Sequence, residues 1–211
     1  MSDSSTPIAI IGMAGVFPDA PRVDILWQNL LAGHDSIREV PSHRWPAQYY
    51  DPSSKSPHRF YARRGAFIDD LARFEALRFG VMPRAVEGAE PDQLMTLQVC
   101  ADSLEDAGYA PRRTEEGERG RPFNRADTQV IIGRGAYIGP AMNSLNLRVR
   151  TSEQLISLIE ERGWLKGDSL DGLRDELLNE LRPFGPDTAI GLVPNLCASR
   201  VADRLGLGGA A

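Results

Sequence analysis

The sequence predicts an α/β fold, and two kinds of segment support that prediction. Residues 8–11 and 129–132 are short, continuously apolar runs rich in β-branched residues, and glycine follows each run. Such runs are typical of strands covered on both faces, because a half-solvated strand alternates apolar and polar residues. Helical apolar patterns lie between and after the two runs. We therefore expect a buried sheet with helices packed against it.

Five segments have the apolar spacing of an amphipathic helix. They are residues 24–31, 92–107, 152–162, 170–181 and 195–205. Asp24, Asp92 and Ser152 begin three of these segments, where a short polar side chain commonly caps a helix. Glycine closely follows four of the five segments, which is where helices commonly end.

Two stretches predict irregular structure. Residues 34–66 contain four prolines and five aromatic residues, Trp45, Tyr49, Tyr50, Phe60 and Tyr61. Disordered segments are poor in aromatic residues, so we expect this stretch to lie over the body of a domain, held by its rings. Residues 111–127 mix arginine, glutamate, glycine and proline and predict an exposed loop.

Composition excludes several classes of protein. The chain has 211 residues, a formal charge of −5, two cysteines and three histidines. The negative charge argues against a nucleic-acid partner, and two cysteines cannot make a disulfide framework. No apolar run is long enough to cross a membrane, and the first residues lack a secretory signal. We expect a cytoplasmic protein without a membrane anchor.

A glycine-rich turn is the first candidate site. Gly133, Gly135 and Gly139 follow the second apolar run, but their spacing is one residue longer than a dinucleotide fingerprint. The preferred interpretation is a strand-to-helix turn with positive φ angles, and Pro140 could open the helix. A nucleotide-dependent reductase stays open as the less favoured alternative.

The nucleophilic and metal-binding side chains form no recognisable motif. Cys100 and Cys197 lie in predicted helices, and a buried structural role is the preferred interpretation for both. His34, His43 and His58 have no metal-ligand spacing, so we expect polar loop residues, no metal site and no bound cofactor.

Arginines could form a basic patch on this acidic chain. Arg59, Arg63 and Arg64, together with the arginines of residues 111–125, could steer an acidic partner. A solvated surface is the alternative interpretation for any single arginine.

Segments in sequential order resemble the β-ketoacyl synthases of polyketide and fatty-acid synthases. The resemblance rests on IAIIGMAGVFP (8–18), LWQNLLAG (26–33), RRGAFIDD (63–70), FGVMPRA (79–85), LEDAGY (104–109) and PNLCASRVADRLGL (194–207). It is closest to multidomain synthases of polyunsaturated fatty acids or iterative polyketides. The family usually has Asp-Pro-Gln-Gln-Arg before its long helix, whereas residues 90–94 are Glu-Pro-Asp-Gln-Leu.

The resemblance implies a thiolase-like, layered α-β-α-β-α fold, of which residues 1–211 would supply most of the first half as a single incomplete domain. The strands at 8–11 and 129–132 would be central. Such a half would expose sheet edges and be poorly stable alone, so we expect it to belong to a longer protein.

The resemblance also implies a reaction. Ketosynthases catalyse the decarboxylative Claisen condensation of acyl and malonyl thioesters. The family's nucleophilic cysteine lies beyond the Leu-Gly-Leu motif at 205–207, and its two histidines lie in the later half. Cys197 matches the helix before that cysteine. We therefore assign no catalytic residue and expect the isolated chain to be inactive.

The implied partners are an acyl carrier protein bearing phosphopantetheine, the remaining half of the domain, and a second subunit of a homodimer. Tyr137, Ile138 and Met142 match a region that lines the acyl pocket near the dimer interface, although ordinary packing within the chain is an equal alternative. A noncatalytic scaffold or carrier-interaction module is the alternative function.

Overall fold

A computed structural model describes residues 7–111, 120–135, 139–181 and 183–210. These residues form two compact units. Unit 1 contains Met1–Arg73 and Asp102–Gly108, and unit 2 contains Phe74–Ala101 and Tyr109–Ala211. None of the helices among the described residues is long and apolar enough to cross a membrane.

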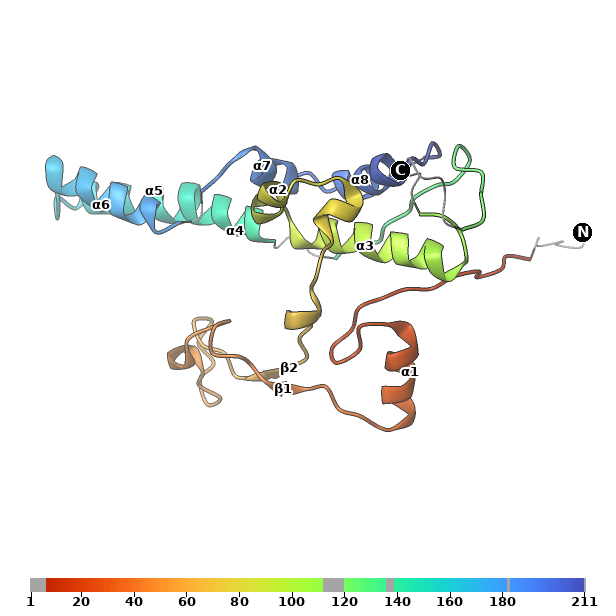
Figure 1. Cartoon of the computed structure of the whole chain (residues 1–211). Coiled ribbons are helices and arrows are strands. Elements are labelled where there is room, and N and C mark those ends of the chain that lie inside the picture. The colour runs from red at the N-terminus through yellow and green to blue at the C-terminus, as the bar shows by residue number, and fades with distance from the viewer. Residues whose placement is uncertain (1–6, 112–119, 136–138, 182, 211) are drawn as a thin grey trace, which may run out of the picture. The chain divides into compact units, whose positions relative to one another are not determined.

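Unit 1 is built from short elements joined by long loops (Figure 1). Its elements are α1 (Val23–Leu31), β1 (Arg38–Glu39), the 3-10 helix η1 (Ala47–Tyr49), β2 (Arg64–Gly65) and the 3-10 helix η2 (Asp69–Leu71). β1 and β2 pair antiparallel, with Arg38 opposite Gly65. The loop between them is held by Trp45, whose ring stacks on Phe60 at 4.2 Å. The predicted aromatic contacts are present within the stretch, but Tyr49, Phe60 and Tyr61 are exposed, so its packing over the body of a domain stays a prediction.

The first predicted strand does not form. Residues 8–11 are extended but pair with no other strand among the described residues, and Ile8 is 95% exposed. The segment is instead held against the end of α3, where Met13 N–H donates to Asp106 Oδ2 at 2.8 Å. A strand is stabilised by ladder hydrogen bonds to a neighbour, so an apolar sequence alone does not produce one.

Unit 2 is helical. Its elements are the 3-10 helix η3 (Ala76–Phe79), α2 (Pro83–Gly88), most of α3 (Pro91–Asp106), α4 (Pro140–Leu145), the π-helical segment η4 (Asn146–Ser152), α5 (Glu153–Glu161), α6 (Asp168–Asn179), α7 (Pro186–Gly191) and α8 (Leu196–Leu205). Its fully buried large side chains include Phe79, Leu97, Val201 and Leu205. The core therefore contains residues of η3, α3 and α8, as the helical patterns of 92–107 and 195–205 predict.

The second predicted strand is also absent. Residues 129–132 lie in irregular backbone, and Ile131 is 87% exposed. Val130 N–H donates to the carbonyl of Ala210 at 3.0 Å, and Gly209 N–H donates to the carbonyl of Thr128 at 3.1 Å. These two hydrogen bonds do not extend into a strand ladder among the described residues. The prediction of two central buried strands is wrong for this structure, for the same physical reason at both positions.

The predicted helix starts also need correction. Ser152 does not begin a helix, because α4, η4 and α5 follow one another without a break and Ser152 has helical backbone angles. Asp24 and Asp92 lie in the first turns of α1 and α3 rather than at caps. Asp24 pairs with Arg22, the N-cap residue of α1, at 2.7 Å. Acidic side chains in a first turn still interact favourably with the helix dipole.

Candidate functional site

The predicted pocket residues are only partly described. Tyr137 and Ile138 lie outside the described residues. Met142 lies in α4, half buried, between the buried residues Ala141 and Ser144. The structure therefore places Met142 in a packed helix, and its assignment to an acyl pocket stays a prediction.

A buried carboxylate holds the start of α4. Glu90 directly precedes α3 and is only 3% exposed. The backbone N–H of Ala141 donates to Glu90 Oε1 at 2.5 Å. The first N–H groups of a helix have no partner within that helix, so Glu90 satisfies one of them with a side-chain oxygen.

Two glycines make room for this carboxylate. A Cβ on Gly139 would meet the Glu90 carboxylate, and a Cβ on Gly191 would meet Glu90 Cγ. Gly191 ends α7, so α3, α4 and α7 come together at Glu90. Neither Gly133, Gly135 nor Gly139 has a positive φ angle, which corrects the predicted reason for these glycines. Gly139 is needed for close approach, and Pro140 does open a helix.

The residues after Glu90 have structural partners as well. Asp92 pairs with Arg134, with Oδ2 and Nε 2.5 Å apart. Gln93 is fully buried, and its amide donates to the carbonyl of Val193 at 3.5 Å, a long contact. The sequence signal for this joint was the Glu-Pro-Asp-Gln-Leu variant of the family motif, although it did not indicate burial. We call residues 90–93 the α3 joint.

Neither cysteine is poised for nucleophilic chemistry. Cys197 is 2% exposed, and burial raises the pKa of the half-buried Cys100 thiol, with a further increase from its electrostatic interaction with Cys197. A nucleophilic cysteine requires the opposite shift, toward thiolate. The predicted buried role is confirmed for Cys197.

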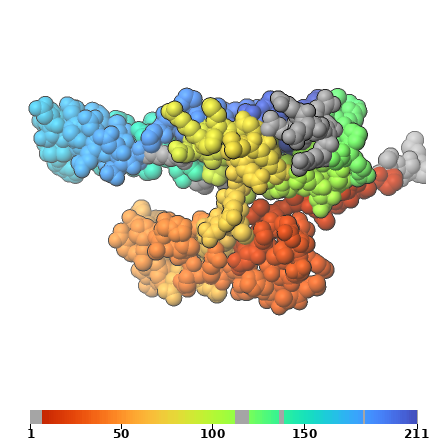
Figure 2. Space-filling model, in the orientation of Figure 1, coloured from red at the N-terminus to blue at the C-terminus, as the bar shows by residue number. Residues whose placement is uncertain are grey.

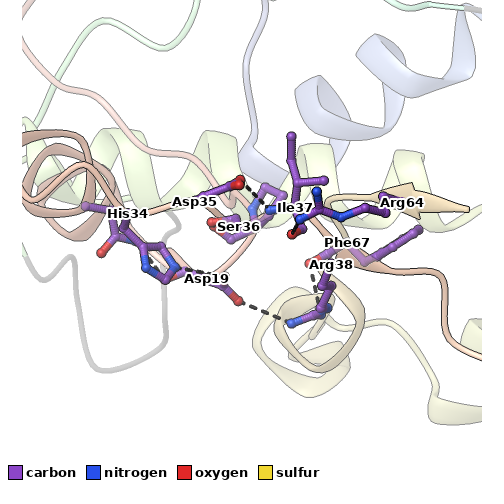
Figure 3. Close-up of polar contacts among 10 residues, drawn as sticks. Asp19, His34, Asp35, Ser36, Ile37, Arg38, Arg64 and Phe67 are labelled. Atoms are coloured by element: carbon purple, nitrogen blue, oxygen red, sulfur yellow. Dashed lines mark hydrogen bonds and ion pairs between the residues drawn. The ribbon is translucent and has the colours of Figure 1, made fainter.

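A polar network fixes the loops of unit 1 (Figure 3). Its centre is Asp19, which has a positive φ angle of 56° in the tight turn from Phe17 to Ala20. Its carboxylate contacts His34 Nε2 at 3.1 Å and Arg38 at 3.4 Å. The hydrogen bond with His34 is the main reason that the pKa of Asp19 lies below its ordinary value. Arg38 also pairs with Asp69 at 3.6 Å, so the network ties the turn to η2.

The histidines take no metal-binding arrangement. Among the described residues no group of three or more His, Cys, Asp or Glu side chains could hold a metal ion. His34 belongs to the Asp19 network, as a polar loop residue.

The predicted basic patch divides into three groups. Arg112, Arg113 and Arg119 lie outside the described residues. Arg125 donates to the carbonyl of Leu205 at 2.7 Å, at the end of α8, and its guanidinium lies over the Phe123 ring. Arg125 therefore has a structural role. Arg59, Arg63 and Arg64 remain exposed.

The α3 joint and the surrounding helices belong to a known domain class. The family model for the "Beta-ketoacyl synthase, N-terminal domain" matches residues 5–211, and the chain belongs to this family. The resemblance identified from the sequence is confirmed.

Curated relatives include polyketide synthases. Polyketide synthase PksN of Bacillus subtilis strain 168 is 42% identical over 107 residues, which are 50% of this chain and 2% of that protein. The orsellinic acid synthase ArmB of Armillaria ostoyae is 36% identical over 149 residues, which are 70% of this chain and 6% of that protein. The chain therefore spans only a small part of these relatives.

Solved ketosynthase structures share the fold. The oxazolomycin ketosynthase domain OzmH KS7 of Streptomyces albus JA3453 matches 96% of this chain and 28% of its own, with a TM-score of 0.59 and 23% identity. The ketosynthase from module 6 of the bacillaene synthase of Bacillus subtilis 168 matches 96% of this chain and 25% of its own, with a TM-score of 0.57 and 22% identity. The thiolase-like fold class is confirmed, although its two central strands are not formed here.

Replacing Gly191 tests the α3 joint. Gly191→Ala brings a Cβ against Glu90 Cγ and within 3.3 Å of Ala141 Cβ. We expect a loss of about 1–3 kcal/mol in the free energy of unfolding, measured by urea denaturation. The matched control is Gly172→Ala in α6, whose added Cβ meets nothing within 4 Å. The control is expected to raise the free energy of unfolding by about 0.5–1 kcal/mol. Equal stability of the two variants would contradict the close packing of Gly191 against Glu90.

Acid titration tests the Asp19 network. Because the pKa of Asp19 is lowered in the folded chain, the folded state binds a proton less readily than the unfolded state. Its contribution to stability is complete above the ordinary aspartate pKa of about 3.9 and is lost as the pH falls through the lower folded value. Asp19→Asn, which tolerates the same φ angle, should show a weaker loss of stability below about pH 4 in urea denaturation. A carboxyl pKa measured by NMR that is higher in the folded chain than in urea would contradict this account.

Proposed function

We propose that residues 1–211 form the N-terminal part of one ketosynthase domain of a polyketide synthase. The match to the family model over residues 5–211 carries this proposal. The whole protein would transfer an acyl group to a cysteine thiolate and condense it with malonyl thioester after loss of carbon dioxide. The substrates would arrive on the phosphopantetheine arm of a carrier protein, so that arm is part of the substrate rather than a resident cofactor.

Three further parts belong to the proposal. The remaining half of the domain would supply the nucleophilic cysteine and the two histidines. A second subunit would complete a homodimer, with Tyr137, Ile138 and Met142 near its interface or in the acyl pocket. A cytoplasmic location suits the two cysteines, neither of which is in a disulfide.

The isolated chain would be catalytically inactive. Support comes from the burial of Cys197, which shields its thiol from an acyl thioester, and from the raised pKa of Cys100, which disfavours its thiolate.

Acylation of the intact chain tests this proposal. We expect no acyl adduct on Cys100 or Cys197 after incubation with an acyl thioester, measured by mass spectrometry of the whole chain and of its peptides. Cys100→Ser and Cys197→Ser should behave like the wild-type chain. A stoichiometric adduct that turns over with malonyl thioester, and that one of these substitutions removes, would overturn the claim of inactivity.

The carrier protein would approach an exposed basic segment in unit 1. Residues 52–64 contain Lys55, Arg59, Arg63 and Arg64 and no acidic residue. Almost every residue of the segment is exposed, including Phe60 and Tyr61. A positive surface with aromatic residues suits an acidic partner, because opposite charges accelerate encounter and aromatic side chains supply contact area.

Charge reversal tests this approach. Lys55→Glu with Arg59→Glu should weaken binding of an acidic acyl carrier protein at least about fivefold, measured by calorimetry at low salt. Arg63 and Arg64 are left intact because they contact Glu39 and the carbonyl of Ile37. Lys166→Glu in unit 2 is the control and should leave the affinity unchanged. An equal loss in the control would show a general charge effect and contradict a specific surface.

A further inference from the structure

Three helices of unit 2 meet around the side chain of Glu90, which directly precedes α3. The chain entering α4 approaches this side chain with the backbone of Gly139 and Ala141, and α7 approaches it with Gly191. Figure 1 shows α2, α4 and α7 close to the start of α3. Glu90, Ala141 and Gly191 are all buried, so the meeting point is packed.

The Glu90 side chain fills the space between α4 and α7. Its Oε1 accepts from Ala141 N–H at 2.5 Å, so the carboxylate is in direct contact with the start of α4. On the other side, a Cβ on Gly191 would lie 2.4 Å from Glu90 Cγ and 3.3 Å from Ala141 Cβ. Because the side chain is in contact on both sides, its length determines how far the start of α4 lies from the backbone of α3.

Two further contacts hold α7. A Cβ on Gly88 of α2 would lie 2.7 Å from Asp187 Cβ, so α2 and α7 are closely packed. Figure 2 shows the yellow atoms of α2 beside the blue atoms of α7. Gln93 of α3 also donates to the carbonyl of Val193, just after α7, at 3.5 Å. A change in the length of residue 90 is therefore transmitted to α4 rather than absorbed by α7.

Met142 moves with the start of α4. It directly follows Ala141 and is half buried. The N–H of Asn143 donates to the carbonyl of Gly139 at 3.0 Å, which joins the entry of α4 to the turn that carries Met142. The helix then continues without a break through η4 into α5. A displacement of Ala141 is therefore also a displacement of Met142.

We propose that Glu90 is a positioning residue that sets the acyl-chain length accepted by the ketosynthase, because it fixes the place of Met142 in the wall of the acyl pocket. The inference rests on the proposed function, which includes that pocket. The family usually has aspartate at position 90, whereas this chain has glutamate, which is longer by one methylene, about 1.5 Å. Apolar pockets distinguish substrates by single methylene groups, so a wall displaced by that distance changes which acyl chain fits.

Acyl selectivity of the whole protein tests the inference. The assay measures kcat/KM for condensation of a short and of a long straight-chain acyl thioester with malonyl thioester. The readout is the ratio of the two values, because a general loss of folded protein lowers both alike. Glu90→Asp should change this ratio at least about fivefold. Glu90→Gln keeps the length and an acceptor oxygen, so it should stay within about twofold of the wild-type ratio.

A matched control separates position 90 from the chemical change itself. Glu176→Asp makes the same shortening at an exposed position of α6 and should leave the ratio unchanged. An equal change in Glu90→Gln and Glu90→Asp would overturn the inference, because side-chain length would then not be the determinant.

A second substitution shows whether Glu90 acts through Met142. Met142→Ala should itself change the ratio at least about threefold, and in that background Glu90→Asp should change it less than about twofold further. An unchanged ratio in Met142→Ala would overturn the inference, even where Glu90→Asp does not fold. So would an equal effect of Glu90→Asp with and without Met142.

The wild-type protein distinguishes the two levels of the argument. A wild-type protein that condenses acyl thioesters, with an unchanged ratio in Glu90→Asp, would overturn this inference alone. A wild-type protein that condenses neither thioester would overturn the proposed function, and this inference with it.

Discussion

A buried carboxylate is the constraint on which unit 2 depends. Glu90 is removed from water and must find donors within the protein, because burial of an unpaired polar group is costly. It accepts from the start of α4, and its side chain occupies the space that a Cβ on Gly139 or Gly191 would need. The rest of the α3 joint adds contacts from Asp92 to Arg134 and from Gln93 to Val193. In this chain the family motif therefore acts as a structural joint between α3, α4 and α7.

Charge is distributed unevenly along the chain, although the composition alone describes a mildly acidic protein. Residues 52–64 are basic without any acidic residue, and residues 153–180 contain the net negative charge. Both segments expose aromatic or aliphatic side chains beside their charges. Each segment therefore places one sign of charge beside exposed apolar surface. The packed joint at Glu90 has no comparable exposure.

Local patterns predicted the helices better than they predicted the strands. The apolar spacing of 92–107 and 195–205 corresponds to α3 and α8, because contacts within one helix depend on residues three or four positions apart. Strands require a ladder of hydrogen bonds from a distant segment, and neither the run at 8–11 nor the run at 129–132 has such a ladder among the described residues. The cap predicted at Ser152 failed for a related reason, since the preceding residues continue the helix through η4.

The sequence by itself determined the family, the helical segments and the absence of a recognisable nucleophile, because ordered motifs and helical spacing are local properties. Only the tertiary structure showed that Glu90 is buried, that Gly139 serves close approach rather than a positive φ angle, and that Asp19 pairs with His34 and Arg38. These facts depend on which distant residues meet. Burial and hydrogen bonding are properties of a packed arrangement, and a one-dimensional pattern does not specify that arrangement.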